Sequence, residues 1–576
     1  MIVNANPNRP PARRLDEAGP ASPNPQFTHG RVWSEIMRAK WILASLAAVV
    51  ASALVASPWN REPRNIGRTE SADLSLAQTA PMAEGVVFED RNRNGRRDPG
   101  ERGIAGVRVS NQRVFDTTDS QGRWKLPYDD DTIFFVVKPA GYMTPVDEVQ
   151  LPEFYYVHKP SGSPKTRFGG VEPTGPLPKS VDFALYKTKE PEKFQALFFG
   201  DTQSRNLREI DYLTRTIIEP LRGSDAAFGV TLGDILFDDL SIFQQHNEAI
   251  ALIGIPWYNV LGNHDINYDA VHDHESDETF HRFYGPNYYS FEYGKAHFVV
   301  LDNVWWMHGT TQSDGRGRYK GSIGVRQLEW LKKDLALVPQ DRLVVLTMHI
   351  PLMDTEEKKE ILELLSQRPY TLSVAAHTHF QQHHFLGEEH GHKGKKPHHH
   401  LVNVTTCGSW WQGSPDNYGI PHSTMRDGAP RGYSIFTFDG NQYSIEFRAA
   451  GKPAAHQMNI YAPDEVRTAE VANTEIVVNV FGGSEKSKVE MRFGEKGQWV
   501  EMTRTPSKDP AYEAMVEKDK ALTTPFRPLP GAIDSPHIWR AKLPAFAGTG
   551  VQPVHIRTTD MFGQVYLATR GIRVVP

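Results

Sequence analysis

Two kinds of hydrophobic pattern divide the chain. Between residues 192 and 440, six short apolar runs rich in β-branched residues alternate with stretches whose apolar positions recur every three or four residues. The runs are 194–199, 226–232, 257–261, 297–301, 343–347 and 372–376. Helical spacing is clearest for Leu207, Ile210, Leu213, Ile217 and Leu221, and for Val325, Leu328, Leu331 and Leu335. Strands that alternate with helices indicate an α/β domain.

On both sides of this segment the pattern changes to short strand-like runs separated by turn residues. Before it, the runs are 85–88, 106–109, 122–126 and 133–137. We therefore predict an Ig-like β-sandwich over residues 84–188. After it, alternating runs such as 475–480 predict a β-rich domain over residues 441–576.

The N-terminal segment has the pattern of a targeting sequence. A short basic start at Met37 is followed by an apolar stretch, and we interpret residues 37–57 as a signal peptide. A retained membrane anchor and a buried helix are the alternatives. We expect residues 1–36 to be disordered or a mis-assigned start, and residues 58–83 to form a linker. We expect secretion to a bacterial periplasm or cell surface, with membrane contact only through an uncleaved signal.

Composition narrows the classes of function. The chain has 576 residues and a formal net charge of −5, so its bulk charge gives no indication of a nucleic-acid partner. Cys407 is the one cysteine, which excludes an intramolecular disulfide and a cysteine-based zinc site. The 23 histidines are more informative, because imidazole is the commonest metal ligand.

Polar side chains directly follow five of the six central runs. They are Asp201 and Gln203, Asp234 and Asp238, Asn263 with His264 and Asp265, His349, and His377 with His379. Because ligands bind beyond the carboxyl ends of strands in open α/β sheets, these residues should meet in one place. Two divalent metals about 3.5–4 Å apart require a bridging carboxylate and oxygen or nitrogen ligands, which this set supplies.

The series resembles the calcineurin-like metallophosphoesterase superfamily over residues 194–440. The segments 287–291, 301–303 and 408–411 are similar to its secreted bacterial branch, which carries an N-terminal and a C-terminal β domain. The resemblance implies a central αββα sandwich and two divalent ions (Mn, Fe, Zn or Mg). The implied ligands are Asp201, Gln203, Asp234 and His379 at site one, and Asp234, Asn263, His349 and His377 at site two.

The resemblance also implies an activity: hydrolysis of phosphate mono- or diesters by a hydroxide that bridges the metals, with His264 as the acid. Asp265 could orient the His264 imidazole or cap a helix. Hydrolysis of a nucleotide or sugar-nucleotide pyrophosphate is an alternative. A surface binding protein on a degenerate core is another, and its best support is Gln203, where the superfamily usually has histidine.

Two departures from the superfamily pattern affect the site. Gln203 offers an amide oxygen, a harder ligand than imidazole, and this favours manganese. Three residues separate Asp234 from Asp238, where two are common. Asp238 is therefore left out of the predicted site.

The sequence of the N-terminal domain contains a second candidate metal-binding loop. Acids or amides occupy positions 1, 3, 5, 9 and 12 of residues 90–101, with glycine at position 6, which is the ligand spacing of a calcium loop. The candidate calcium ligands are Asp90, Asn92, Asn94, Asp98 and Glu101. A turn rich in Asp and Asn without metal is the alternative.

Two further clusters could bind ligands. Seven histidines lie within residues 383–400, and we interpret this stretch as a solvated insertion between two strands rather than a metal site. The pairs 305–306 and 410–411 are both Trp-Trp. They could stack on a base, a sugar or a lipid headgroup, or simply pack their loops.

Overall fold

The computed structural model describes residues 81–309, 318–523 and 525–576. Residues 1–36 and the predicted signal peptide, together with nearly all of the predicted linker, lie outside these ranges. No helix within the described ranges is long and apolar enough to cross a membrane.

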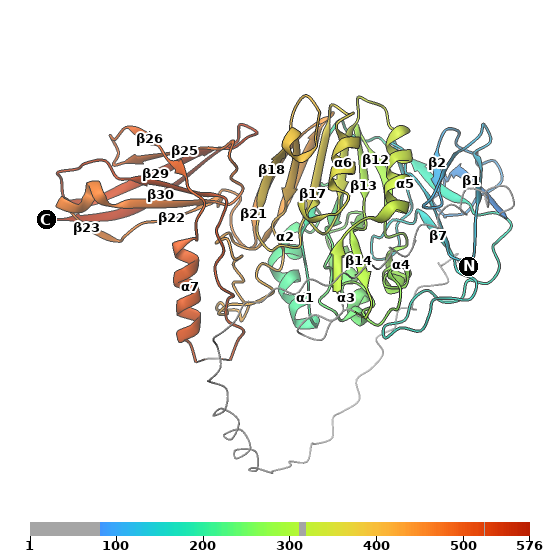
Figure 1. Cartoon of the computed structure of the whole chain (residues 1–576), viewed down its shortest axis with the longest axis horizontal. Helices are drawn as coiled ribbons and strands as arrows, with labels where there is room; N and C mark the ends of the chain where they lie inside the picture. Colours follow the sequence, from blue (N-terminus) through green and yellow to red (C-terminus); the bar gives the residue numbers. More distant parts are fainter. Residues whose placement is uncertain (1–80, 310–317, 524) are drawn as a thin grey trace, which may run out of the picture. The chain divides into compact units, whose positions relative to one another are not determined.

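Two sheets form the centre of the structure (Figure 1). The first has the strand order β11-β10-β9-β20-β21, with β9 at Lys193–Phe199, β10 at Phe228–Thr231, β11 at Trp257–Asn259, β20 at Gly432–Asp439 and β21 at Gln442–Ala449. The second has the order β12-β13-β16-β17-β19-β18, with β12 at Tyr289–Tyr293, β13 at Ala296–Val300, β16 at Leu343–Thr347, β17 at Thr371–Ala375, β18 at Gln382–Leu386 and β19 at His398–Val402. The first sheet runs on to Ala449, past the predicted boundary at 440.

Alternation along β9 explains how the layers stack. Phe198 points into the core between the sheets, where its ring centroid lies 4.1 Å from that of Phe436. Its neighbours Leu197 and Phe199 point to the opposite face and pack against helices α1 (Leu207–Leu213) and α3 (Phe243–Ala251). A strand buried on both faces in this way requires a helix layer outside the sheet.

The predicted helices are present on both outer faces. The helix expected over 207–221 consists of α1, a π-helical turn at Thr214–Ile218 and α2 (Glu219–Leu221). Helices α5 (Gly324–Ala336) and α6 (Lys358–Leu365) share the core of the second sheet. Together these layers confirm the predicted α/β sandwich. Near its edge lie α4 (Glu278–Tyr284), β14 (Val304–Met307) and β15 (Arg318–Gly321).

The N-terminal β domain consists of two four-stranded sheets, ordered β4-β1-β8-β6 and β3-β2-β5-β7. The strands are β1 Met82–Glu89, β2 Arg108–Ser110, β3 Phe115–Thr117, β4 Arg123–Pro127, β5 Thr132–Val136, β6 Tyr142–Met143, β7 Tyr155–His158 and β8 Phe183–Lys187. Its core is continuous with the central core. Trp330 of α5 joins the two, because its indole N–H donates to Ser110 Oγ at 3.1 Å.

The C-terminal β domain has a hydrophobic core of its own. Its sheets are ordered β22-β24-β28-β27 and β23-β30-β29-β25-β26. The elements are β22 Met458–Tyr461, β23 Glu465–Arg467, β24 Glu475–Val480, β25 Lys488–Phe493, β26 Trp499–Glu501, β27 Thr503–Arg504, α7 Pro510–Ala521, β28 Ile538–Lys542, β29 Gly550–Thr559 and β30 Val565–Val575.

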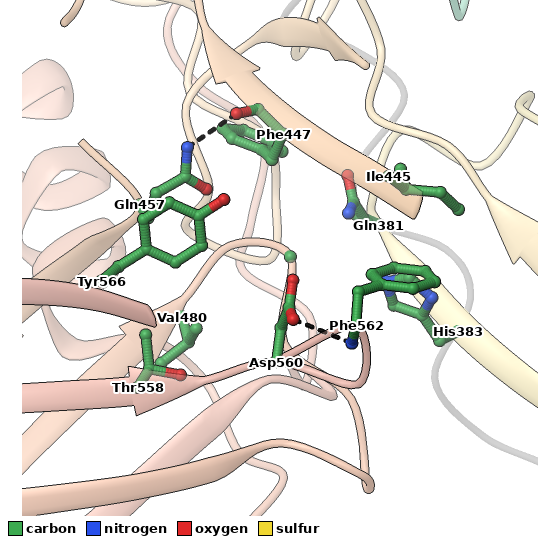
Figure 2. Close-up of a pocket in the computed structure, with 11 residues that line it drawn as sticks. Gln381, His383, Ile445, Phe447, Gln457, Val480, Thr558, Asp560, Phe562 and Tyr566 are labelled. Atoms are coloured by element: carbon green, nitrogen blue, oxygen red, sulfur yellow. Dashed lines mark hydrogen bonds between the residues drawn. The ribbon is translucent and has the colours of Figure 1, made fainter. Parts of the chain in front are cut away.

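A crevice lies where this domain meets the central sandwich, and none of the residues that line it is a predicted metal ligand (Figure 2). It is lined by residues of both parts, among them Gln381, His383, Phe447, Asp560 and Tyr566. The Asp560 carboxylate is occupied by its own turn, since it accepts the N–H of Phe562 at 2.8 Å. The crevice therefore marks a junction between domains that is lined by both polar and apolar side chains.

The histidine-rich stretch is not the solvated insertion that we predicted. His398, His399 and His400 form the body of β19 and are buried. Ser373 Oγ lies 2.7 Å from His398 Nε2 and 2.8 Å from His400 Nδ1. Burial lowers the pKa of His398 to about 3. Neutral imidazoles with hydrogen-bond partners can occupy a sheet interior, which is why composition alone misplaced this segment.

Trp330 allows a test of the continuous core. Its ring packs against Phe115 and Tyr288, with centroid distances of 5.7 and 5.2 Å. Trp330→Ala should lower the free energy of unfolding by roughly 3–5 kcal/mol, the usual cost of removing a buried tryptophan. Thermal and urea unfolding measure this. Trp305→Ala, at a partly exposed position, is the control, and an equally small effect of both substitutions would contradict the continuous core.

Candidate active site

The predicted site residues meet at one edge of the sandwich. Asp201, Asp234 and Asn263 follow β9, β10 and β11, and these three strands are parallel. His349 and His377 follow β16 and β17, which are parallel neighbours in the second sheet. The carboxyl ends of both sheets therefore supply the ligands, as the strand-end pattern predicts.

Four of the predicted site-two atoms converge around His349. Its Nε2 lies 3.2 Å from Asp234 Oδ1, 3.1 Å from Asn263 Oδ1 and 3.0 Å from His377 Nδ1. Ligand atoms of Asp234, His349 and His377 all lie within 4.8 Å of one another, and this is the one such group in the described part of the chain. Two imidazoles, a carboxylate and an amide oxygen suit a divalent first-row metal.

Backbone carbonyls select the imidazole nitrogens that face the site. His349 Nδ1 lies 2.8 Å from Leu232 O, and His379 Nδ1 lies 2.5 Å from Gly408 O. A carbonyl only accepts, so each Nδ1 carries a proton and Nε2 is the nitrogen that faces the site. Hydrogen bonds of this kind are the usual way in which proteins orient metal-binding histidines.

Site one is less converged. His379 Nε2 lies 3.4 Å from Asp201 Oδ2, as two ligands of one ion would. The Gln203 amide nitrogen, however, donates to Asp234 Oδ2 at 2.8 Å, while its oxygen lies 3.6 Å from the Cys407 thiol. The oxygen expected to bind metal therefore faces Cys407, and the amide would have to turn over to act as a ligand.

The charges of the site are strongly coupled. Burial opposes ionisation of Asp234, but the nearby His349 and His264 hold its pKa below its usual range. Burial acts against the charged form of His349 as well, yet Asp234 raises the pKa of this imidazole to about 9. Burial lowers the pKa of His377 to about 3 and that of His379 to about 4. These last two imidazoles are neutral at pH 7, the form that binds metal.

Two glycines allow the ligands to approach each other. A Cβ at position 233 would lie 2.6 Å from His349 Nδ1, and one at position 262 would lie 1.9 Å from the Asp234 backbone nitrogen. Five of the predicted ligands also have positive φ, a region that non-glycine residues rarely adopt: Asp201, Gln203, Asp234, His377 and His379. The strand ends are thus bent sharply to aim these side chains at one point.

The carboxylate that contacts the His264 ring belongs to Asp238. Asp238 Oδ1 lies 2.5 Å from His264 Nδ1, so this carboxylate accepts a hydrogen bond from the Nδ1–H of the ring. His264 Nε2 faces Asp234 Oδ2 at 4.0 Å. Asp265 instead accepts the backbone N–H groups of Ile235, Leu236 and Gly262. Asp265 therefore stabilises the loops that carry Ile235 and Gly262. Asp238, which was left out of the predicted site, orients the His264 imidazole.

Several neighbours of the site were not predicted from the sequence. Phe237 stacks on His264 with ring centroids 4.3 Å apart, and Arg205 lies over the Phe237 ring. Trp410 stacks on His379 at 4.1 Å, whereas its partner Trp411 is buried in the helix-side core. Asp238 had a sequence signal in its Gly-Asp motif, and Trp410 had one in the Trp-Trp pair at 410–411. Phe237 and Arg205 have no motif, because their roles depend on tertiary contact.

The candidate calcium residues lie together on one loop after β1. Asp90 Oδ2 accepts the N–H of Gly95 at 2.8 Å. The side-chain amides of Asn92 and Asn94 both donate to Asp98 Oδ2 at 2.7 Å, and Glu101 Oε2 accepts the N–H of Asp98. These contacts form a closed turn of Asp and Asn residues, and calcium binding stays a prediction.

Solved structures show only distant likeness. Purple acid phosphatase PPD1 from yellow lupin (Lupinus luteus) seeds is 14% identical, with a TM-score of 0.32 over 64% of each chain, so the match spans less than two thirds of that phosphatase. CopC from Methylosinus trichosporium OB3b is 15% identical, with a TM-score of 0.13 over 20% of this chain and 90% of its own. TM-scores this low carry no argument about function. No curated protein sequence matches the chain.

Family models match the three parts of the chain in order. Residues 91–171 match the N terminal of calcineurin-like phosphoesterase, 194–381 match calcineurin-like phosphoesterase, and 400–566 match the C terminal of calcineurin-like phosphoesterase. The middle match covers the strand ends that carry Asp201 to His379. The chain therefore belongs to the calcineurin-like phosphoesterases, metal-dependent hydrolases of phosphoric esters.

Proposed function

We propose that this protein hydrolyses phosphate mono- or diesters at the Asp234–His349 edge of the sandwich, with two divalent metals of which manganese is favoured. The observation that supports the proposal best is the convergence of Asp234, Asn263, His349 and His377, with the imidazole of His264 beside them. Hydrolysis of a nucleotide or sugar-nucleotide pyrophosphate uses the same residues and remains the alternative.

The protein's own residues prepare the site for ester cleavage. When bound, the metals supply Lewis acidity and lower the pKa of water. Asp234 faces both sites, Asp201 and His379 serve site one, and Asn263, His349 and His377 serve site two. His264 holds a proton at Nε2, on the side that faces Asp234, and can give it to the leaving oxygen. Asp238 keeps the ring in that orientation through Nδ1.

We further propose that the reaction takes place outside the cytoplasm. The support is the composition of residues 37–57, where a basic start precedes an apolar stretch shorter than a membrane span. A phosphoesterase in the periplasm or at the cell surface would meet esters released there.

Asp234 should be required for both metals. Asp234→Asn removes the charge that faces both sites, so both ions and the activity should be lost together. Elemental analysis of the dialysed protein and turnover of p-nitrophenyl phosphate and bis(p-nitrophenyl) phosphate with added manganese measure this. Asp211→Asn, on the outer helix α1, is the control. A variant that keeps two ions and normal turnover would show that Asp234 is not shared.

Substitution of Asp238 and substitution of Asp265 should have different effects on turnover and stability. Asp238→Asn should reduce turnover roughly 10- to 100-fold with little change in melting temperature, because the imidazole loses its positioning carboxylate. The loss should be larger for alkyl phosphates than for p-nitrophenyl phosphate, whose leaving group needs no proton. Asp265→Asn should instead destabilise the fold by about 2–3 kcal/mol, because buried N–H groups lose their acceptor.

Kinetics on both substrates together with thermal unfolding of each variant separate the two roles. Equal dependence on the leaving group in wild type and Asp238→Asn would contradict the positioning of His264 by Asp238. A stable but inactive Asp265→Asn protein would show instead that Asp265 has a catalytic role.

Gln203 should make site one the weaker site. The amide donates to Asp234 and must turn over before its oxygen can bind an ion, so site one should lose its metal first on dialysis. Gln203→His should raise its occupancy and shift preference toward zinc, since imidazole is the softer ligand. Metal content after dialysis, paired with activity titrations, measures this. Identical occupancy and preference in both proteins would show that Gln203 is not a ligand.

A further inference from the structure

An arginine lies beside the proposed acid. The Arg205 guanidinium carbon lies 4.2 Å from the centre of the Phe237 ring, and the His264 ring centroid lies 4.3 Å from the same ring. Phe237 therefore contacts both the guanidinium and the imidazole. Arg205 is thus separated by one aromatic ring contact from the imidazole that would protonate the leaving oxygen.

Arg205 is held in place from two directions. Its backbone N–H donates to Glu209 Oε2 at 2.8 Å, and its Nη1 lies 3.4 Å from Glu209 Oε1. Nη1 also donates to the carbonyl of Trp410 at 2.6 Å, and the Trp410 ring stacks on the site-one histidine His379. The guanidinium is thus fixed between Phe237 and Trp410, the ring neighbours of His264 and His379, and we call this position the rim of the site.

Part of the guanidinium is uncommitted. Within the described ranges, the side-chain hydrogen bonds of Arg205 all come from Nη1, and Nε and Nη2 donate to no protein atom. Nε and Nη2 form one edge of the planar fork. Such an edge matches two oxygens of a carboxylate or phosphate at once.

The C-terminal domain places a second guanidinium at the same rim. Arg527, which follows α7, donates from Nη2 to Glu209 Oε1 at 2.7 Å and is about half exposed, with 48% of its side chain accessible. One buried carboxylate is therefore shared by two arginines. Because arginine stays protonated in proteins, the three groups leave one positive charge in excess. A rim of this kind attracts an anion and would not favour a neutral alcohol.

We propose that Arg205, supported by Glu209 and Arg527, binds a second negatively charged group carried by the leaving group of the substrate. The preferred substrates are then phosphoric esters or anhydrides whose leaving group bears its own carboxylate or phosphate. This inference rests on the proposed function, because it takes its direction from His264 as the acid. It selects among substrates that the shared metal chemistry leaves open.

Matched substrates test the proposal. Glycerol 3-phosphate and 3-phosphoglycerate differ in one carboxylate, and AMP and ADP differ in whether the leaving group is a neutral nucleoside or a phosphate. With manganese present, the wild type should favour the charged member of at least one pair, which also tells the carboxylate from the phosphate. Arg205→Met should lose roughly 10- to 100-fold in kcat/KM for that member and little for its neutral partner. Arg527→Met should act in the same direction, more weakly.

Arg208→Met, on the exposed face of α1, is the control for net charge and should change neither member. Equal loss on both members in Arg205→Met would overturn the proposal, since it would place Arg205 on the scissile phosphate. Equal rates for both members of each pair in the wild type would overturn it as well. If Arg205→Met does not fold, Arg527→Met and Arg205→Lys test the same proposal. Each of these variants keeps at least one of the two guanidinium groups at the rim.

A binding measurement separates this inference from the proposed function. Calorimetry of the manganese-loaded protein with 3-phosphoglycerate and glycerol 3-phosphate should show tighter binding of the first, and the difference should disappear in Arg205→Met. If no ester is hydrolysed but this difference is found, the function fails and the anion site stands. If esters are hydrolysed without any such difference in binding or rate, the anion site fails and the function stands.

Discussion

The buried carboxylate of Asp234 is the constraint on which the rest of the site depends. An isolated carboxylate inside a protein is very costly, so donors must surround it. Its Oδ1 accepts the backbone N–H of His264 at 2.8 Å and lies 3.2 Å from His349 Nε2. Its Oδ2 accepts from the side-chain amide of Gln203 at 2.8 Å. These donors follow three different strands in two sheets. The sandwich therefore has to bring both sheets to the same edge before this charge can be buried.

That requirement explains the unusual backbone at the edge. Five ligands have positive φ, at a cost of order 1–3 kcal/mol for each residue held in a sparsely populated region. The strain persists because both sheets beneath it are packed on two faces, with rings such as Phe228 of the first sheet and Phe298 of the second in contact between them. A soft scaffold would relax these turns and let the ligand atoms drift apart. Rigid strands and sharply bent strand ends are thus two parts of one arrangement.

The sequence predicted what is local and missed what is tertiary. Short apolar runs and helical spacing predicted the central strands and helices, because the pattern of apolar positions determines which faces of an element are buried. The strand-end positions of Asp234 and His349 followed from the same pattern. Neither spacing nor motif could say that Asp238, rather than Asp265, contacts His264, because both follow strand ends within reach of the ring. The burial of His398–His400 was missed because histidine is polar in composition yet neutral and hydrogen-bonded in this sheet.

The C-terminal domain completes the site by supporting loops that the sheets leave unsupported. Asp427 Oδ2 accepts the N–H of Gln381, two residues beyond His379, at 2.9 Å, and lies 3.0 Å from Nε2 of His537 in the C-terminal domain. Arg527 reaches Glu209 and hence the arginine at the rim. Both contacts act on segments just past a strand, where ladder hydrogen bonds have ended. The loops that carry the predicted ligands therefore need a second layer of support, and in this chain a separate β domain provides it.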